Sequence, residues 1–159
     1  MLALITLAIW SLGCIFSPVT AITLPFTTTN LLDGAITMQL PEFIDKGIKQ
    51  LVERQANAWE TGDSDKIIAD FVEDCLFIVP GSTFKGKRQI KESAESYFAE
   101  FAETQITIKR IIANGNEGAI EWNWSDKNKK TGEITQAEDA IIFELEGGKI
   151  KYWREYIDD

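Results

Sequence analysis

Three runs in the last third of the chain alternate apolar and polar residues, with the two-residue period of β-strands. The runs span residues 118–126, 136–145 and 149–158, and polar or glycine-containing segments separate them. In the first two runs one face is mostly apolar and also carries an acid: Ile120, Trp122, Trp124 and Asp126, then Asp139, Ile141, Phe143 and Leu145. In the third run Trp153 and Glu155 share one face, and Tyr152, Arg154 and Tyr156 share the other.

The first half of the chain has the period of amphipathic helices instead. Pro41 suits a first helical turn, and the stripe that follows consists of Ile44, Ile48, Leu51, Val52, Gln55 and Trp59. Gly62 is expected to end this helix, and Asp63 or Ser64 to cap a short second helix. The inner side of the second helix is expected to carry Ile67, Ile68 and Phe71. A third helix is predicted after Gly86, with a stripe of Ile90, Ala94, Tyr97, Phe98 and Phe101.

Two further strands are predicted, over residues 75–79 and 105–113. The element order is therefore helix, helix, strand, helix and four strands. Because short turns join the last four strands, we expect these to be antiparallel neighbours. The pattern predicts a single α+β domain over residues 41–158, with helices on one face of a curved antiparallel sheet.

Composition narrows the chemistry available to this domain. The 159 residues include no histidine, which excludes Ser-His and Cys-His pairs and imidazole bases. Acid–base chemistry must then depend on carboxylates, tyrosines, lysines or water. The two cysteines, Cys14 and Cys75, form neither a metal motif nor a disulfide framework. With a net charge of −9 and no cluster of Lys or Arg, nucleic acid is not an expected partner.

The first 32 residues carry no charged side chain, and two interpretations of them stay open. Residues 1–21 fit a secretory signal peptide or an uncleaved anchor, which would place the protein outside the cytoplasm or at a membrane. Alternatively, translation starts at Met38 and the protein is cytoplasmic. Residues 22–40 are rich in threonine and lack a period, as in a linker.

Four segments together resemble the SnoaL-like branch of the nuclear transport factor 2 superfamily: Trp59–Asp63, Val79–Gly81, Gly86–Ile90 and Phe143–Asp158. The resemblance covers about residues 41–158. It implies a cone-shaped fold, in which a bent sheet wraps around the long N-terminal helix and leaves an apolar pocket at the open end. Members of this superfamily include cyclases, isomerases, dehydratases, epoxide hydrolases and non-catalytic binding or dimerisation domains.

The catalytic residues of two member families carry over only in part. Ketosteroid isomerases use a tyrosine, a general-base carboxylate and a protonated acid; the corresponding positions here hold Gln55, Val79 and Asp139. Limonene-type epoxide hydrolases use an Arg-x-Asp and an acid on the last strand. Here Asp126 and Glu155 match the two acids, but the arginine is missing.

The candidate catalytic residues are therefore Asp126, Asp139 and Glu155. A carboxylate beside tryptophans in a dry pocket would have a raised pKa and serve as an acid or base near neutral pH. The candidate pocket wall consists of Gln55, Trp59, Trp122, Trp124, Phe143 and Trp153. Simpler placements remain open: Asp126 in solvent, Asp139 paired with a lysine or capping a backbone amide, Glu155 paired with Arg154 on the outer face or at a dimer interface, and Gln55 satisfied by backbone.

We expect a small apolar or aromatic ligand in this pocket, with no metal and no cofactor. One hypothesis is acid–base catalysis of the cyclase, isomerase, dehydratase or hydrolase type. The alternative is a non-catalytic binding or dimerisation module that forms a homodimer through the outer face of the sheet.

Overall fold

The computed structural model describes residues 40–158, with side chains from Lys46 onwards. The predictions of a signal peptide or anchor over residues 1–21 and of a linker over residues 22–40 lie outside the described residues, except for Leu40. Within residues 40–158, no helix is long and apolar enough to cross a membrane.

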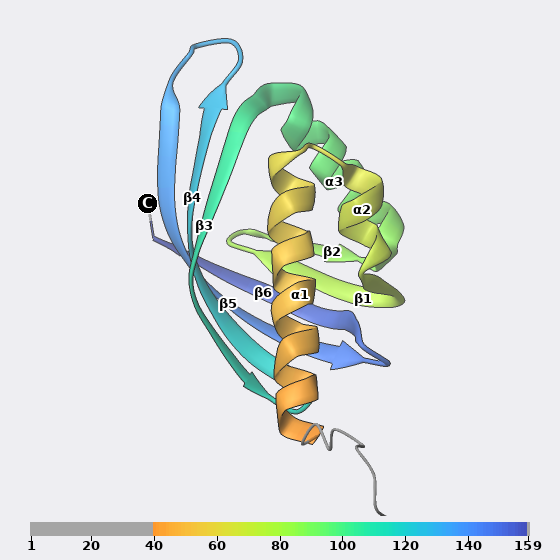
Figure 1. Ribbon diagram of the computed structural model, residues 1–159. Coiled ribbons are helices and arrows are strands. Elements are labelled where there is room, and N and C mark those ends of the chain that lie inside the picture. The colour runs from red at the N-terminus through yellow and green to blue at the C-terminus, as the bar shows by residue number, and fades with distance from the viewer. Residues whose placement is uncertain (1–39, 159) are drawn as a thin grey trace, which may run out of the picture. The chain divides into compact units, whose positions relative to one another are not determined.

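Three helices and six strands follow one another in the part of the chain that the structure describes. In order they are α1 (Leu40–Glu60), α2 (Ser64–Ala69), β1 (Phe71–Val79), β2 (Ser82–Lys85), α3 (Gly86–Glu100), β3 (Phe101–Asn114), β4 (Glu117–Asn128), β5 (Ile134–Glu146) and β6 (Lys149–Asp158). Figure 1 shows a strongly bent sheet with all three helices on its concave side. The domain therefore has the predicted α+β architecture.

The six strands form one sheet in the order β2-β1-β6-β5-β4-β3. Strands β3 to β6 are antiparallel neighbours, as predicted. Within the described sheet, strands β1 and β6 are the one pair of neighbours that run parallel, and Phe77 of β1 lies opposite Trp153 of β6. Strand β6 therefore occupies the middle of the sheet and joins the β1–β2 hairpin to the β3–β5 meander.

The core lies between α1 and the concave face of the sheet. The helix buries Ile48, Leu51 and Val52, whose side chains are at most 2% exposed. The sheet contributes four residues predicted to face inward, Ile120, Trp122, Ile141 and Phe143, together with Ile150 and Trp153 of β6, none more than 1% exposed. Each such side chain contributes about 1.5–3 kcal/mol relative to an exposed position. The register is fixed because slipping by one residue would move this whole set to the outer face.

Glycine and aspartate define the junction between the first two helices. Gly62 adopts a φ of 67°, a left-handed conformation that glycine enters without strain. Asp63 caps α2 by accepting a hydrogen bond of 3.0 Å from the backbone N–H of Lys66. The end of α1 and the cap of α2 are thus as predicted.

Three details of the predicted elements are wrong. Strand β1 starts at Phe71, so this side chain belongs to the sheet and not to α2. Strand β2 was not predicted, because four residues after a Pro80-Gly81 turn carry too few alternations to define a period. Phe101 has extended dihedrals and starts β3, although its ring still stacks on Tyr97 at 5.1 Å. The four-residue spacing between Tyr97 and Phe101 fits two structures. Phe101 could belong to the last turn of the helix, or it could be the first residue of a strand that packs against that turn.

Candidate functional site

A cavity of about 270 Å³ lies between the helices and the concave face of the sheet. Most of its wall is aromatic or aliphatic, and two carboxyl groups and two hydroxyl-bearing side chains interrupt it. The lining residues are Trp59, Phe77, Val79, Phe84, Ser93, Tyr97, Trp124, Ala137, Asp139, Glu155 and Ile157. No lysine or arginine is among them.

The aromatic wall is built around Trp59 at the C-terminal end of α1. Its ring centroid lies 5.8 Å from that of Tyr97 on α3 and 5.7 Å from that of Trp124 on β4, both in edge-on contact. It also stacks on Phe77 of β1 at 6.3 Å, and Phe77 in turn contacts Phe84 of β2 at 6.0 Å. These contacts hold the wall in one arrangement and favour an apolar or aromatic occupant.

The two acids of the cavity lie on neighbouring strands. Asp139 of β5 is opposite Ile157 of β6, and Glu155 of β6 is opposite Ile141 of β5. The two carboxyl groups are therefore diagonal neighbours on the inner face, within reach of one small ligand. The structure also settles the orientation of β6, because Trp153 is 1% exposed while Arg154 on the opposite face is exposed.

Each of these acids accepts a hydrogen bond from an indole and not from a cation. Trp122 Nε1–H donates to Asp139 Oδ2 at 2.9 Å, and Trp153 Nε1–H donates to Glu155 Oε1 at 2.8 Å. The second oxygen of Asp139, Oδ1, is buried and has no partner among the described residues. Neither acid takes part in an ion pair within residues 46–158. The expectation of a lysine beside Asp139 is therefore wrong.

Burial without a counter-charge changes the proton affinity of both groups. It raises the pKa of Glu155 to about 7; the hydrogen bond from Trp153 opposes this rise, and the negative charge of Asp139 adds to it. Burial also raises the pKa of Asp139, again opposed by an indole hydrogen bond, from Trp122. Glu155 is therefore present in both protonation states near neutral pH and is able to give or take a proton.

Asp126 is buried behind the wall and does not line the cavity. Its side chain is 6% exposed, so the solvent placement considered above is wrong. Its Oδ2 accepts hydrogen bonds from the Tyr97 hydroxyl at 2.7 Å and from Trp124 Nε1–H at 3.0 Å. Since burial raises the pKa of Tyr97, this phenol keeps its proton. Asp126 thus fixes two rings of the wall and does not itself face the ligand space.

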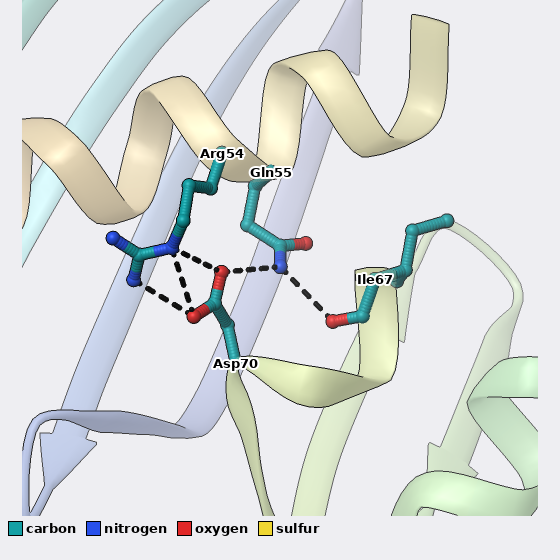
Figure 2. A network of polar contacts seen from close by, with 4 residues as sticks. All are labelled: Arg54, Gln55, Ile67 and Asp70. Carbon is teal, nitrogen blue, oxygen red and sulfur yellow. Dashed lines mark hydrogen bonds and ion pairs between the residues drawn. The ribbon is translucent and has the colours of Figure 1, made fainter. Parts of the chain in front are cut away.

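Gln55 also lies outside the cavity wall, and Figure 2 shows what it contacts. Its amide Nε2 donates to the backbone oxygen of Ile67 at 3.0 Å and to Asp70 Oδ2 at 3.3 Å. Arg54 holds the same Asp70 carboxylate with two guanidinium nitrogens. The glutamine is therefore a buried link between α1 and the end of α2, in agreement with the backbone-satisfied interpretation.

Of the remaining predicted wall residues, Trp59 and Trp124 line the cavity. Trp122, Phe143 and Trp153 pack in the core beside it, each at most 1% exposed. Sequence reasoning missed the contributions of Tyr97, Phe77 and Phe84 to the wall. The stripe of the third helix contained Tyr97, but nothing in the stripe distinguished a cavity-facing ring from a core ring.

Among the described residues, no group of three or more Cys, Asp or Glu side chains is arranged to hold a metal ion. Asp139 and Glu155 alone offer too few ligands for a closed site. The chemistry that the cavity itself supports is proton transfer and hydrogen bonding to a small molecule.

Comparison with known proteins places this geometry in a family. The model of the SnoaL-like domain matches residues 52–153, more than half of the chain. A nuclear transport factor 2-like protein from Anabaena variabilis shares 23% identity at a TM-score of 0.67, over 79% of this chain and 96% of its own. A limonene epoxide hydrolase-like enzyme from Mycobacterium tuberculosis shares 24% identity at a TM-score of 0.63, over 71% and 84%.

A candidate polyketide cyclase from Xanthomonas campestris shares 18% identity at a TM-score of 0.65, over 71% of this chain and 91% of its own. At these identities the likeness establishes the fold, and the predicted cone architecture is confirmed. A search of curated proteins gave no significant match.

Proposed function

The chain belongs to the SnoaL-like domain family, and on this premise we propose that it encloses a small apolar or aromatic molecule and catalyses proton transfer on it. The observation that carries the proposal is the pair of carboxyl groups, Asp139 and Glu155, in an aromatic cavity whose described lining residues include no lysine or arginine. Family membership alone does not decide the activity, because the same fold carries unrelated functions.

Glu155 is the proton carrier in this proposal. A general acid or base is most effective when its pKa lies near the working pH, and the pKa of Glu155 is raised to about 7. Asp139 supports this role through its negative charge, which raises the proton affinity of its neighbour. Asp126 and Gln55 have no direct part, because both lie behind the wall.

The volume limits the size of the ligand. An apolar cavity of about 150 Å³ already holds benzene, and this cavity measures about 270 Å³. A single substituted ring or a small bicyclic molecule is therefore the expected size.

The neutral aromatic probe 5-nitro-1,2-benzisoxazole tests the proposal without knowledge of the natural substrate. A base removes its ring C–H proton, the N–O bond breaks, and the coloured 2-cyano-4-nitrophenolate is released. We expect catalysis whose kcat/KM rises with pH through about 7, as Glu155 becomes the carboxylate. Glu155→Gln should abolish this catalysis.

Glu144→Gln is the matched control. It removes the same charge from an exposed position on the outer face of β5 and should leave the rate unchanged. A rate that is equal in wild type and Glu155→Gln, with both proteins folded by circular dichroism, would refute Glu155 as the base.

A second candidate function, dimerisation, is favoured by an apolar row on the outer face. Ile112 of β3 is opposite Ala119 of β4, which is opposite Ile142 of β5. The two isoleucines are 54% and 47% exposed, and the nearby Tyr156 is 47% exposed. We propose that two copies of the protein associate through this row. Sedimentation equilibrium of wild type and Ile142→Glu tests this association. A wild-type protein that is monomeric at micromolar concentration would contradict it.

A further inference from the structure

The cavity wall combines two features that an apolar ligand alone does not use. Five of its side chains are aromatic: Trp59, Phe77, Phe84, Tyr97 and Trp124. Among the described lining residues the only charged groups are the two acids of β5 and β6. Helix α1 and strands β1, β2 and β4 contribute no charged lining residue, and α3 contributes Ser93 and Tyr97. The faces of aromatic rings carry negative potential, so the rings and the carboxylates attract the same kind of ligand.

The acids also lack the partners that buried carboxylates normally have. An uncompensated buried charge is destabilising unless it is paired, hydrogen-bonded or neutralised by a proton. Asp139 is 6% exposed, and its Oδ1 has no hydrogen-bond partner among residues 46–158. Within the same range the half-buried Glu155 has a single donor, the Trp153 indole. None of the described residues that line the cavity carries a positive charge to balance these acids.

We propose that the ligand of this cavity is a small organic cation, an alkylammonium or protonated amine attached to an apolar group. This inference rests on the proposed small-molecule site and names its ligand class. The cationic head lies against the Glu155 carboxylate and the ring of Trp59 or Trp124, and the apolar part fills the space beside Phe77 and Phe84. A neutral ligand of the same shape would desolvate Glu155 without compensating its charge.

The two assignments share Glu155, because the same carboxylate pairs with the cationic head and takes a proton from the bound molecule. A bound cation next to Glu155 favours its charged form. Binding at neutral pH should therefore release protons, about half a proton per site at pH near 7, where Glu155 is half protonated.

Choline and its carbon isostere 3,3-dimethylbutan-1-ol provide a matched pair of probes that differ in the charge of one atom. Isothermal titration of the whole protein at about pH 8 should show choline binding about tenfold more tightly than the alcohol, a difference of about 1.4 kcal/mol. The preference should disappear as Glu155 becomes protonated below about pH 6. Asp139 and Tyr97 are the other titratable groups of the wall, and Tyr97 stays neutral throughout because its pKa is raised.

Glu155→Gln should bind the two probes equally, whereas Glu144→Gln should keep the preference. Equal affinities in the wild-type protein, or no binding of choline at millimolar concentration, would overturn the proposal. So would a preference that survives in Glu155→Gln. Catalysis of the neutral benzisoxazole without a preference for choline would remove the cation assignment alone, and the reverse result would remove only the proton-transfer function.

Discussion

Replacing Glu155 by glutamine is expected to stabilise the protein at alkaline pH. The pKa of Glu155 is about 7 in the folded protein and 4.5 in an unperturbed chain. Between these values the folded state binds more protons than the unfolded state, so stability falls as the pH rises. This loss of folding stability is absent below about pH 4.5 and complete above about pH 7. Glutamine removes the charge and retains an oxygen that accepts the Trp153 indole hydrogen bond.

The magnitude follows from the two proton affinities. A tenfold change in proton affinity corresponds to about 1.4 kcal/mol. The difference between pKa values of 4.5 and about 7 therefore makes the ionised carboxylate about 3 kcal/mol unfavourable in the folded state. We expect Glu155→Gln to gain this amount relative to wild type between about pH 4.5 and pH 8.

Urea unfolding at a series of pH values measures this difference directly. The free energy of unfolding of wild type is subtracted from that of Glu155→Gln at each pH, which cancels most contributions of other titrating groups. Glu144→Gln, an exposed change of the same charge, should give a difference that does not vary with pH in this way. Equal m-values are required for the comparison.

A difference between wild type and Glu155→Gln that is independent of pH would refute the argument. It would show that the carboxyl group titrates near its ordinary value and that water or a cation compensates its charge. A loss of stability in Glu155→Gln at about pH 8 would mean that the carboxylate is favourable in the fold. Either result would also remove Glu155 as a base active near neutral pH.

Two further substitutions test the hydrogen bonds around the cavity and the core. Trp153→Phe removes the indole donor to Glu155, which should raise the pKa of Glu155 above about 7. A titration of the carboxyl ¹³C signal by NMR measures this pKa. A pKa lower than in wild type would contradict the role of the indole hydrogen bond. Gln55→Met removes the amide that donates to Ile67 and should lower the free energy of unfolding by about 1–3 kcal/mol in urea. Gln50→Met, on the exposed side of α1, is its control and should have little effect.

The sequence was most informative where one face of an element is buried. Alternation placed Trp122, Asp139 and Phe143 on the inner face of β4 and β5, and the structure confirms this. Burial determines that pattern, so it is visible in a single sequence. The orientation of β6 was harder to decide, because Trp153 on one face and Tyr156 on the other are both aromatic.

The composition of the site was only partly predictable. Trp122 and Trp124 are identical in pattern, yet one packs in the core and the other lines the cavity. The difference depends on which strands and helices meet around each ring, which a periodic pattern does not encode. The indole partners of Asp139 and Glu155 were missed for a related reason, since one of them crosses between strands and depends on register.

The central place of β6 in the sheet has a consequence for how the domain forms. The hairpin β1–β2 and the meander β3–β5 are each assembled from neighbouring segments, but Phe77 meets Trp153 across 76 positions of the chain. Contacts between such distant positions are the slow ones in folding. We expect the hairpin and the meander to form first. The acid-bearing strand Lys149–Asp158 then pairs with both of them, and only this pairing completes the cavity.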